Sequence, residues 1–274
     1  MLAEVPGRPG TQRSAWVWVM SDPLIIDFHS YLGREPYGDH AQRADELVAA
    51  MDRCGIDVTV VAPFVDSPGP DASAHRTLEE ACQQFPQRLI PFARLDPRYG
   101  AQALAMLEMA IDSMGFRGVL FSPVSTNSLP YHRGVLPMMR TAAERAIPVL
   151  IPSGNSYVGL PEQIAWLAAA VPDLSVIVGH MGTAAHAVRA IALAAEHPNL
   201  YLETSLQQGV RRLPLAVDRV GAERILFGSA APYGQQDVEL LKVRKAGLDH
   251  VSQAKVLGQN AARLLGLTAG TERA

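Results

Sequence analysis

The segment LSVIVGH, residues 174–180, is an almost unbroken run of apolar residues that ends in a histidine. Further runs of the same character occupy residues 24–29, 57–64, 88–95, 117–121, 147–151, 199–204 and 224–229. Runs of this length and composition are typical of strands buried on both faces, as in a parallel sheet covered by helices. The sequence therefore predicts eight parallel strands.

Helical patterns fill the spaces between these runs. Leu104, Leu107 and Ile111 fall on one face of a helix, as expected where a helix packs on a barrel. Gly55 and Gly221 each stand shortly before a predicted strand, where glycine ends a helix in the left-handed conformation at little cost. Helices are therefore expected between successive strands.

This alternation predicts an α/β fold, a single (β/α)8 TIM barrel. The chain has 274 residues, and about 250 residues is the usual size of such a barrel. A doubly wound open sheet is the alternative, but no G-x-G-x-x-G motif follows the first strand. We expect the barrel over residues 21–270, after a flexible N-terminal tail over residues 1–20, where Met20 is a second candidate for the start of translation.

The composition argues against several classes of protein. Hydrophobic residues make up 48% and charged residues 19% of the chain, which supports a large core. A formal net charge of −3 with interspersed signs offers no basic stripe for nucleic acid and no polybasic segment for a membrane surface. Cys54 and Cys82 are expected to be reduced, packed thiols of a cytoplasmic protein. The expected partner is a small molecule, and a homo-oligomer stays open.

The chemistry of such barrels lies at the carboxyl ends of the strands. The first strand ends in Asp27, His29 and Tyr31, which alternate along the chain and are expected to point the same way. His180 follows the sixth strand. The other strand ends supply the candidate substrate-binding residues Arg94, Ser122, Ser153, Asn155, Glu203, Ser229 and Tyr233.

Two histidines at strand ends favour function over packing. We expect His29 and His180 to be catalytic as acid and base, with Tyr31 donating to a developing oxyanion. Arg94 could anchor a substrate carboxylate, although an ion pair with Asp96, Asp27 or Glu203 carries more weight. Histidines within predicted helices, including His40, His75, His186, His197 and His250, are expected at the surface.

Several stretches resemble the amidohydrolase-related (amidohydrolase 2) family over about residues 24–267. They are IIDFHSYLG (25–33), QRLIPFARLDP (87–97), GFRGVLFSP (115–123), IPVLIPSGN (147–155), PDLSVIVGHMG (172–182), NLYLETS (199–205), RILFGSAAPYG (224–234) and NAARLLGL (260–267). The family includes metal-dependent decarboxylases and hydrolases of small organic acids. The resemblance implies a metal site built from a D-x-H-x-H strand, a histidine after strand five, the histidine of G-H-x-G and an aspartate in F-G-S-D.

This chain departs from that pattern at most ligand positions. His29 and His180 match it, but Tyr31, Pro152 and Ala230 stand where the resemblance implies further ligands. A catalytic zinc needs about three protein ligands, and the side chains of proline and alanine offer no donor atom. We therefore expect no metal and no other cofactor.

Asp27 and Glu203 are the residues that could restore a metal site. Without one, the sequence predicts a metal-independent hydrolase of an activated lactone, ester or β-keto acid, with histidine acid–base catalysis worth about 10²–10⁴-fold. Some relatives in the superfamily are lactonases that act without metal. A decarboxylase or other lyase on a small organic acid is one alternative, and a catalytically inactive barrel that binds a ligand or partner is another.

Overall fold

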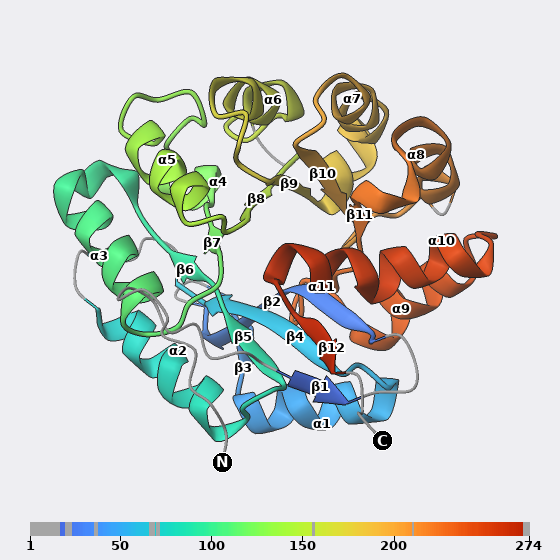
Figure 1. The fold of residues 1–274 in the computed structure, drawn as a ribbon, viewed down its shortest axis with the longest axis horizontal. Helices are drawn as coiled ribbons and strands as arrows, with labels where there is room; N and C mark the ends of the chain where they lie inside the picture. The colour runs from blue at the N-terminus through green and yellow to red at the C-terminus, as the bar shows by residue number, and fades with distance from the viewer. Residues whose placement is uncertain are drawn as a thin grey trace, which may run out of the picture.

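A computed structural model describes residues 17–19, 24–35, 38–65, 69, 72–154, 157–209 and 211–270. Parallel strands form an inner ring and helices an outer ring (Figure 1). The barrel strands are β2 (Ile26–Arg34), β4 (Val58–Pro63), β5 (Leu89–Pro91) with its continuation β6 (Ala93–Arg94), β7 (Val119–Leu120), β8 (Val149–Pro152), β9 (Val176–Gly179), β10 (Leu200–Glu203) and β11 (Ile225–Leu226). All eight predicted strands are present, and the (β/α)8 barrel is confirmed.

Backbone hydrogen bonds close the ring. The strands pair in the orders β2-β4-β5 and β6-β7-β8-β9-β10-β11. Phe92 N donates to Val61 O at 2.8 Å, which continues the ladder from β4 past β5. Phe28 N donates to Phe227 O at 2.9 Å, which joins the first strand to the last.

The outer ring follows the predicted alternation. Its helices are α1 (Ala44–Cys54), α2 (Ser73–Gln84), α3 (Ala101–Asp112), α5 (Leu136–Glu144), α6 (Pro161–Ala170), α7 (Thr183–Glu196), α8 (Arg212–Val220), α9 (Gln236–Arg244) and α10 (His250–Ala254). Gly55 ends α1 in the left-handed conformation, with φ 70°, as its place before β4 predicts. The apolar faces of these helices form one core with the outward side chains of the strands.

A second, smaller core fills the barrel itself. Phe28 and Phe92 meet edge to face there, with ring centroids 5.5 Å apart. Gly118 of the neighbouring strand makes this packing possible, because a Cβ at its position would overlap the Phe92 ring. The middle of the barrel is therefore solid, as in other closed barrels of eight strands.

The helix α11 (Asn260–Leu265) covers the amino end of the barrel. Leu265 packs in the inner core, and the Asn260 amide donates to Ala222 O at 2.7 Å and Ile225 O at 2.8 Å, just before and at the start of β11. The chain then forms β12 (Thr268–Gly270), which pairs in parallel with β1 (Val17–Val19). The rest of segment 1–20 lies outside the described residues, so the flexible tail stays a prediction.

His75 corrects one expectation from the sequence, because it is fully buried rather than exposed. It lies on the inner face of α2 with Leu78 and Cys82, three and seven residues further on. Its Nε2 accepts a hydrogen bond from Arg94 N at 3.2 Å, and its ring meets Phe116 at a centroid distance of 5.4 Å. His75 is buried because it lies on the same face of the helix as Leu78 and Cys82, although its residue type favoured the surface.

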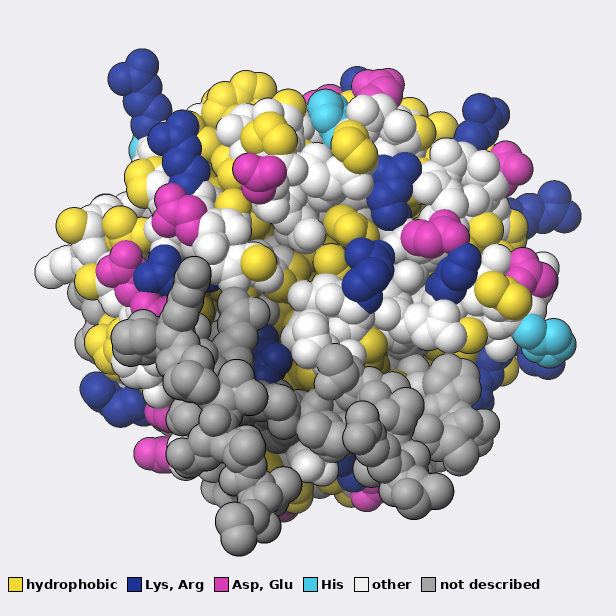
Figure 2. All heavy atoms as spheres, in the orientation of Figure 1, with side chains coloured by type: hydrophobic (Ala, Val, Ile, Leu, Met, Phe, Trp, Pro, Cys, Tyr) yellow, Lys and Arg dark blue, Asp and Glu magenta, His cyan; other side chains and the backbone are white. Residues whose placement is uncertain are grey.

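The surface agrees with the charge pattern of the sequence. Acidic and basic side chains are interspersed over the face in Figure 2. None of the described helices is long and apolar enough to cross a membrane. Cys54 and Cys82 are free thiols, half-buried and buried respectively, as expected.

Candidate active site

A bulge in β2 turns His29 into the barrel. The pairing of β2 with β4 shifts register between Asp27 and Ser30, so that Phe28 and His29 together oppose Val60. Val60 and Phe28 both belong to the inner core. A bulge of this kind places one extra residue opposite a single partner and re-aims the side chains around it. His29 can therefore face inward beside Tyr31, and its Nε2 lies 2.9 Å from Tyr31 Oη.

The same bulge makes the expected direction of Asp27 wrong. Asp27 does not join His29 and Tyr31, because the inserted residue breaks the alternation between them. Its buried carboxylate accepts hydrogen bonds from Ser229 N at 2.8 Å, Ser229 Oγ at 2.5 Å and Gln236 Nε2 at 3.1 Å. Burial raises the pKa of Asp27 to about 6, against the lowering effect of these bonds. Asp27 and Ser229 together tie β2 to the end of β11.

His29 and Glu203 form a fully buried pair at the carboxyl end of the barrel. The His29 Nδ1 lies 3.0 Å from Glu203 Oε2, and neither side chain is exposed. A Cβ at position 228 would overlap the Glu203 carboxylate, so Gly228 leaves the space that this carboxylate fills. The F-G-S stretch (residues 227–229) thus leaves space for the Glu203 carboxylate and supplies no metal ligand.

The charges of this pair stabilise each other. Burial disfavours a charge on His29, but Tyr31 and the Glu203 carboxylate outweigh that effect and raise the pKa of His29 well above its ordinary value. Burial likewise acts to raise the pKa of Glu203, but His29, His180 and the Ser205 N–H lower it below its ordinary value. The pair is an imidazolium and a carboxylate at neutral pH.

His180 lies on a strained turn between β9 and α7. His180, Met181 and Thr183 have φ values of 59°, 48° and 55°, in the left-handed region that residues other than glycine rarely adopt. The turn aims His180 N at Glu203 Oε2, at a distance of 3.1 Å. The same carboxylate therefore holds the His29 side chain and the His180 backbone.

Ser205 connects the His180 ring to that carboxylate. Its Oγ donates to Glu203 Oε2 at 2.8 Å and lies 2.8 Å from His180 Nδ1. Because the hydroxyl hydrogen goes to Glu203, His180 Nδ1 must be the donor to Ser205 Oγ. The Nε2 atom then carries the lone pair, and none of the described residues hydrogen-bonds to it.

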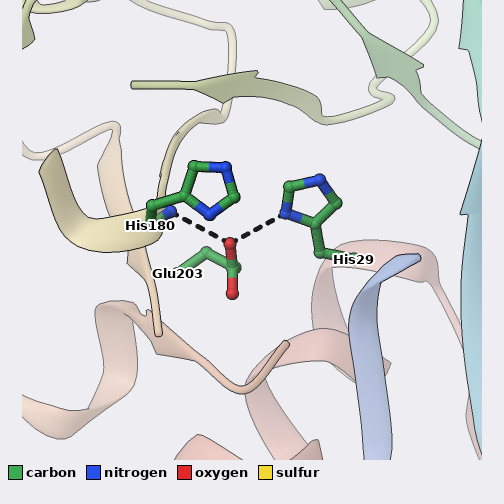
Figure 3. A group of neighbouring side chains, drawn as sticks. All are labelled: His29, His180 and Glu203. Atoms are coloured by element: carbon green, nitrogen blue, oxygen red, sulfur yellow. Dashed lines mark hydrogen bonds and ion pairs between the residues drawn. The ribbon is translucent and has the colours of Figure 1, made fainter. Parts of the chain in front are cut away.

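The two histidines consequently differ in charge although they stack on each other. Their ring centroids are 5.1 Å apart, and both side chains lie over Glu203 in Figure 3. Burial and the positive charge of His29 lower the pKa of His180 to about 4. His180 is therefore neutral and basic at Nε2, while His29 is a fixed cation. Opposed pKa shifts in one site are a mark of acid–base chemistry.

Aromatic side chains surround the outer part of this cluster. Tyr31 stacks on Phe64 at 5.2 Å, and Tyr233 meets Tyr31 and Phe64 edge-on at 5.8 and 5.3 Å. Tyr233 is 43% exposed and donates to Glu35 Oε1 at 2.5 Å. Tyr233 therefore lies at the barrel mouth, as expected from its position after β11.

Arg94 brings a buried positive charge to the same wall. Its guanidinium carbon lies 5.8 Å from the centre of the Tyr31 ring. Its Nη1 donates to Pro63 O at 3.1 Å and its Nη2 to Ser125 Oγ at 2.8 Å. Asp96, the partner weighed from the sequence, receives Arg98 Nη2 at 2.6 Å.

The remaining predicted residues lie around the cluster in structural contacts. Ser122 begins the short helix α4 (Pro123–Thr126), and its Oγ lies 2.9 Å from Ser125 Oγ. Ser153 donates to Gly159 O at 2.9 Å. Asn155 lies outside the described residues.

Ser205, which was not among the predicted site residues, lies between Glu203 and His180. The signal was present, because Ser205 follows Glu203 by two residues and so leaves the strand on the same side. Gln236 gave no such signal, since it reaches Asp27 from a helix more than two hundred residues further along the chain.

Comparisons with known proteins support the family resemblance. A family model described as "Amidohydrolase" matches residues 15–267. A comparison with curated proteins gives no match. Among solved structures, 5-carboxyvanillate decarboxylase from Sphingomonas paucimobilis is similar with a TM-score of 0.72 and 16% identity, over 90% of this chain and 100% of that chain.

Two further solved structures have the same fold. One is 2,6-dihydroxybenzoate decarboxylase from Rhizobium, with a TM-score of 0.72 and 18% identity over 90% of this chain and 99% of that chain. The other is dihydroxybenzoic acid decarboxylase from Polaromonas sp. JS666 with bound manganese and an inhibitor, 2-nitroresorcinol. Its TM-score is 0.70, with 20% identity over 92% of this chain and 98% of that chain.

Proposed function

This chain belongs to the amidohydrolase family, and we propose that it is a metal-independent decarboxylase of a small organic acid that carries its own electron sink, such as a β-keto acid. The observation that carries the proposal is the buried cation–base arrangement of His29 and His180 over one carboxylate. The decarboxylases among the similar structures favour a lyase over the hydrolase that the sequence put first. Because those structures are less than 25% identical, the likeness itself extends to the fold alone.

The described donors of the site fit an ion pair better than a metal ion. Possible ligand atoms of His29, His180 and Glu203 lie within 4.8 Å of one another. Glu203 Oε2, however, already accepts hydrogen bonds from His29 Nδ1, His180 N and Ser205 Oγ.

The neighbouring strands do not complete a metal site. Pro152 and Ala230 carry no donor atom in their side chains, and Asp27 is turned toward Ser229 and Gln236. A catalytic metal usually has three protein ligands and one open position. Pro152 and Ala230 therefore add no ligand to the group formed by His29, His180 and Glu203.

In the proposed reaction the carbon–carbon bond to the carboxylate breaks, and carbon dioxide leaves. The bonding electron pair moves to the β-carbonyl oxygen and forms an enolate. Tyr31 donates a hydrogen bond to this oxygen, while the His29 imidazolium donates to Tyr31 Oη and strengthens it. A solvent proton taken up at His180 Nε2 is then transferred to the carbon of the enolate. Arg94, on the same wall, holds the substrate carboxylate before it leaves.

Hydrolysis of an activated lactone or ester is the second candidate. Neutral His180 favours it, because a free Nε2 lone pair can take a proton from water. The two reactions leave different products, carbon dioxide in one case and an acid with an alcohol in the other.

The test is product analysis on a panel of β-keto acids, lactones and esters, before and after treatment with a chelator. We expect carbon dioxide release that survives the chelator and falls by about 10²–10⁴-fold in His180→Ala. His250→Ala, at an exposed histidine, is the matched control. Elemental analysis of the active protein that returned one zinc, manganese or iron per chain would overturn the metal-independent mechanism.

A further inference from the structure

A strained turn follows β10 and carries Ser205 into the site. Gln207 N donates to Thr204 O at 3.4 Å, which closes a turn with Ser205 and Leu206 as its two central residues. Leu206 has a φ of 55°, in the left-handed region where such a turn normally has glycine or asparagine. A leucine keeps this conformation only where its surroundings hold it there. The place of Ser205 therefore depends on the groups that hold Leu206.

An ion pair on α9 holds this turn from outside the reacting cluster. Glu239 Oε2 accepts a hydrogen bond from Leu206 N at 3.2 Å, and Lys242 Nζ donates to Gln207 O at 2.9 Å. Glu239 and Lys242 are three residues apart on the helix, and Lys242 Nζ lies 2.5 Å from Glu239 Oε2. The Glu239 side chain is only 6% exposed, so water competes little for these contacts. Two consecutive residues of the turn are thus bound by one pair of side chains.

The held turn is connected in its own right to the turn that carries His180. The buried Gln207 side chain donates from Nε2 to Thr183 O at 3.1 Å, and its Oε1 accepts from Gly209 N at 3.1 Å. Thr183 is one of the residues with positive φ in the turn between β9 and α7. Gln207 therefore joins the turn bound by α9 to the turn that aims His180.

The packing leaves little room for either turn to move. Met181 and Thr204, the chain neighbours of His180 and Ser205, line a gap of about 20 Å³ together with the ion pair of α9. A gap of this size holds about one water molecule. A change in the ion pair is therefore passed on to both turns, because there is little free space to absorb it.

We propose that Glu239 is a positioning residue, which fixes the His180 ring through Ser205 from outside the reacting cluster. The Glu239 carboxylate holds Leu206 N, and Ser205 is the residue directly before Leu206. Ser205 Oγ in turn lies between Glu203 Oε2 and His180 Nδ1. Loss of the carboxylate releases the strained turn, so that Ser205 no longer holds His180 in the tautomer that leaves Nε2 free. The expected effect on the rate rests on the proposed function, whereas the effect on the ring does not.

The test compares Glu239→Ala with Glu239→Gln. In Glu239→Ala, nitrogen NMR of the full chain is expected to show a smaller share of the Nδ1–H tautomer of His180. The kcat of carbon dioxide release is expected to fall by about 10- to 100-fold with KM little changed, because the ring is misplaced and binding is not. Glu239→Gln keeps an oxygen that can accept from Leu206 N and should restore the tautomer and most of kcat. An unchanged His180 signal in the folded Glu239→Ala protein overturns the proposal, and so does a Glu239→Gln protein that behaves like Glu239→Ala.

Asp57→Ala is the matched control. The Asp57 carboxylate accepts a hydrogen bond from Ile25 N at 2.8 Å directly before β4, so this variant also removes the acceptor of one backbone N–H. Asp57→Ala and Glu239→Ala are both expected to lower the midpoint of unfolding in urea, but only Glu239→Ala should change the His180 signal. The same change of that signal in Asp57→Ala would assign it to lost stability and contradict the proposal.

Lys242→Ala decides the question if Glu239→Ala does not fold. It removes the donor to Gln207 O and leaves Glu239 in place, so the His180 signal should change in the same direction by a smaller amount. No change in the folded Lys242→Ala protein would overturn the proposal. If none of the β-keto acids, lactones and esters is turned over, the proposed function fails, while the His180 signal still decides whether Glu239 positions the ring.

Discussion

The two ends of the barrel bury different kinds of residue. At the carboxyl end, His29, His180 and Glu203 are buried together and joined by hydrogen bonds. At the amino end, Leu265 of α11 packs on the inner core, and the chain leaves an apolar cavity beside it. In barrels of this type the carboxyl end supplies the chemistry and the amino end the stability. One set of strands therefore serves both purposes, because each purpose uses a different end of the barrel.

The largest effect is expected where charge is buried, at Glu203. Glu203→Ala removes the partner of the His29 imidazolium and leaves a buried charge uncompensated, which typically costs about 3–5 kcal/mol. We expect both the free energy of unfolding in urea and the carbon dioxide release to fall. Glu196→Ala, at an exposed carboxylate on α7, is the control. A stable and active Glu203→Ala protein would remove the distinction between the two ends.

A substitution at the amino end is expected to change the stability of the protein without changing its activity. Leu265→Ala creates a cavity in the inner core and is expected to lower the free energy of unfolding by about 2–5 kcal/mol. Activity per folded molecule should stay unchanged, because the reacting cluster lies at the other end. Leu241→Ala, at a leucine that is 53% exposed, controls for the substitution itself. Loss of activity in the folded Leu265→Ala protein would contradict this division.

A smaller effect is expected at Ser205. Ser205→Ala leaves His180 Nδ1 without its acceptor and should cost about 1–3 kcal/mol of stability. It should also change the tautomer of His180, which nitrogen NMR of the imidazole detects directly. Ser153→Ala, at another buried serine, should cost a similar amount and leave the His180 spectrum unchanged. An unchanged His180 tautomer in Ser205→Ala would show that Ser205 does not position this ring.

The pH dependence of kcat/KM tests the carboxyl end through the smallest of the expected effects. In the second candidate reaction, hydrolysis, His180 must be neutral to take a proton from water, so that activity is present above the pKa of His180 and lost as the pH falls through about 4. Asp27, with a pKa of about 6, and Glu239, with a pKa of about 7, are two further buried groups that shape the acid side of the profile. The profile of kcat/KM should keep its acid limb near 4 in Asp27→Asn. An acid limb near the ordinary histidine value of about 6.5 would show that His180 is not held neutral by its surroundings.

The fold was predictable because strands that are buried on both faces appear in the sequence as nearly continuous apolar runs. The run at residues 174–180 is apolar except for Ser175 and the final His180, and the strand β9 (Val176–Gly179) lies within it. The place of His180 was predictable for the same reason, since strand ends meet at one face of a barrel. The fold and the position of His180 at the end of a strand therefore both followed from apolar runs.

The details of the site were less accessible to sequence reasoning. The direction of Asp27 depends on a bulge, and the bulge depends on how β2 pairs with β4, which no local pattern encodes. The partnership of Glu203 with His29 links residues 174 positions apart, so the sequence left it open between several roles. His75 was misassigned because its residue type was weighed before its spacing with Leu78 and Cys82.

Gly228 allows the site to be altered without changing any titratable group, because a side chain at this position would meet the Glu203 carboxylate. A methyl group at this position would act as a wedge that forces the carboxylate away from its place beside His29. Gly228→Ala could therefore retune the proton affinity of the histidine while every ionisable residue stays in the chain. A neutral methyl group at position 228 would therefore change the pKa of His29 indirectly, by displacing the Glu203 carboxylate that lies beside it.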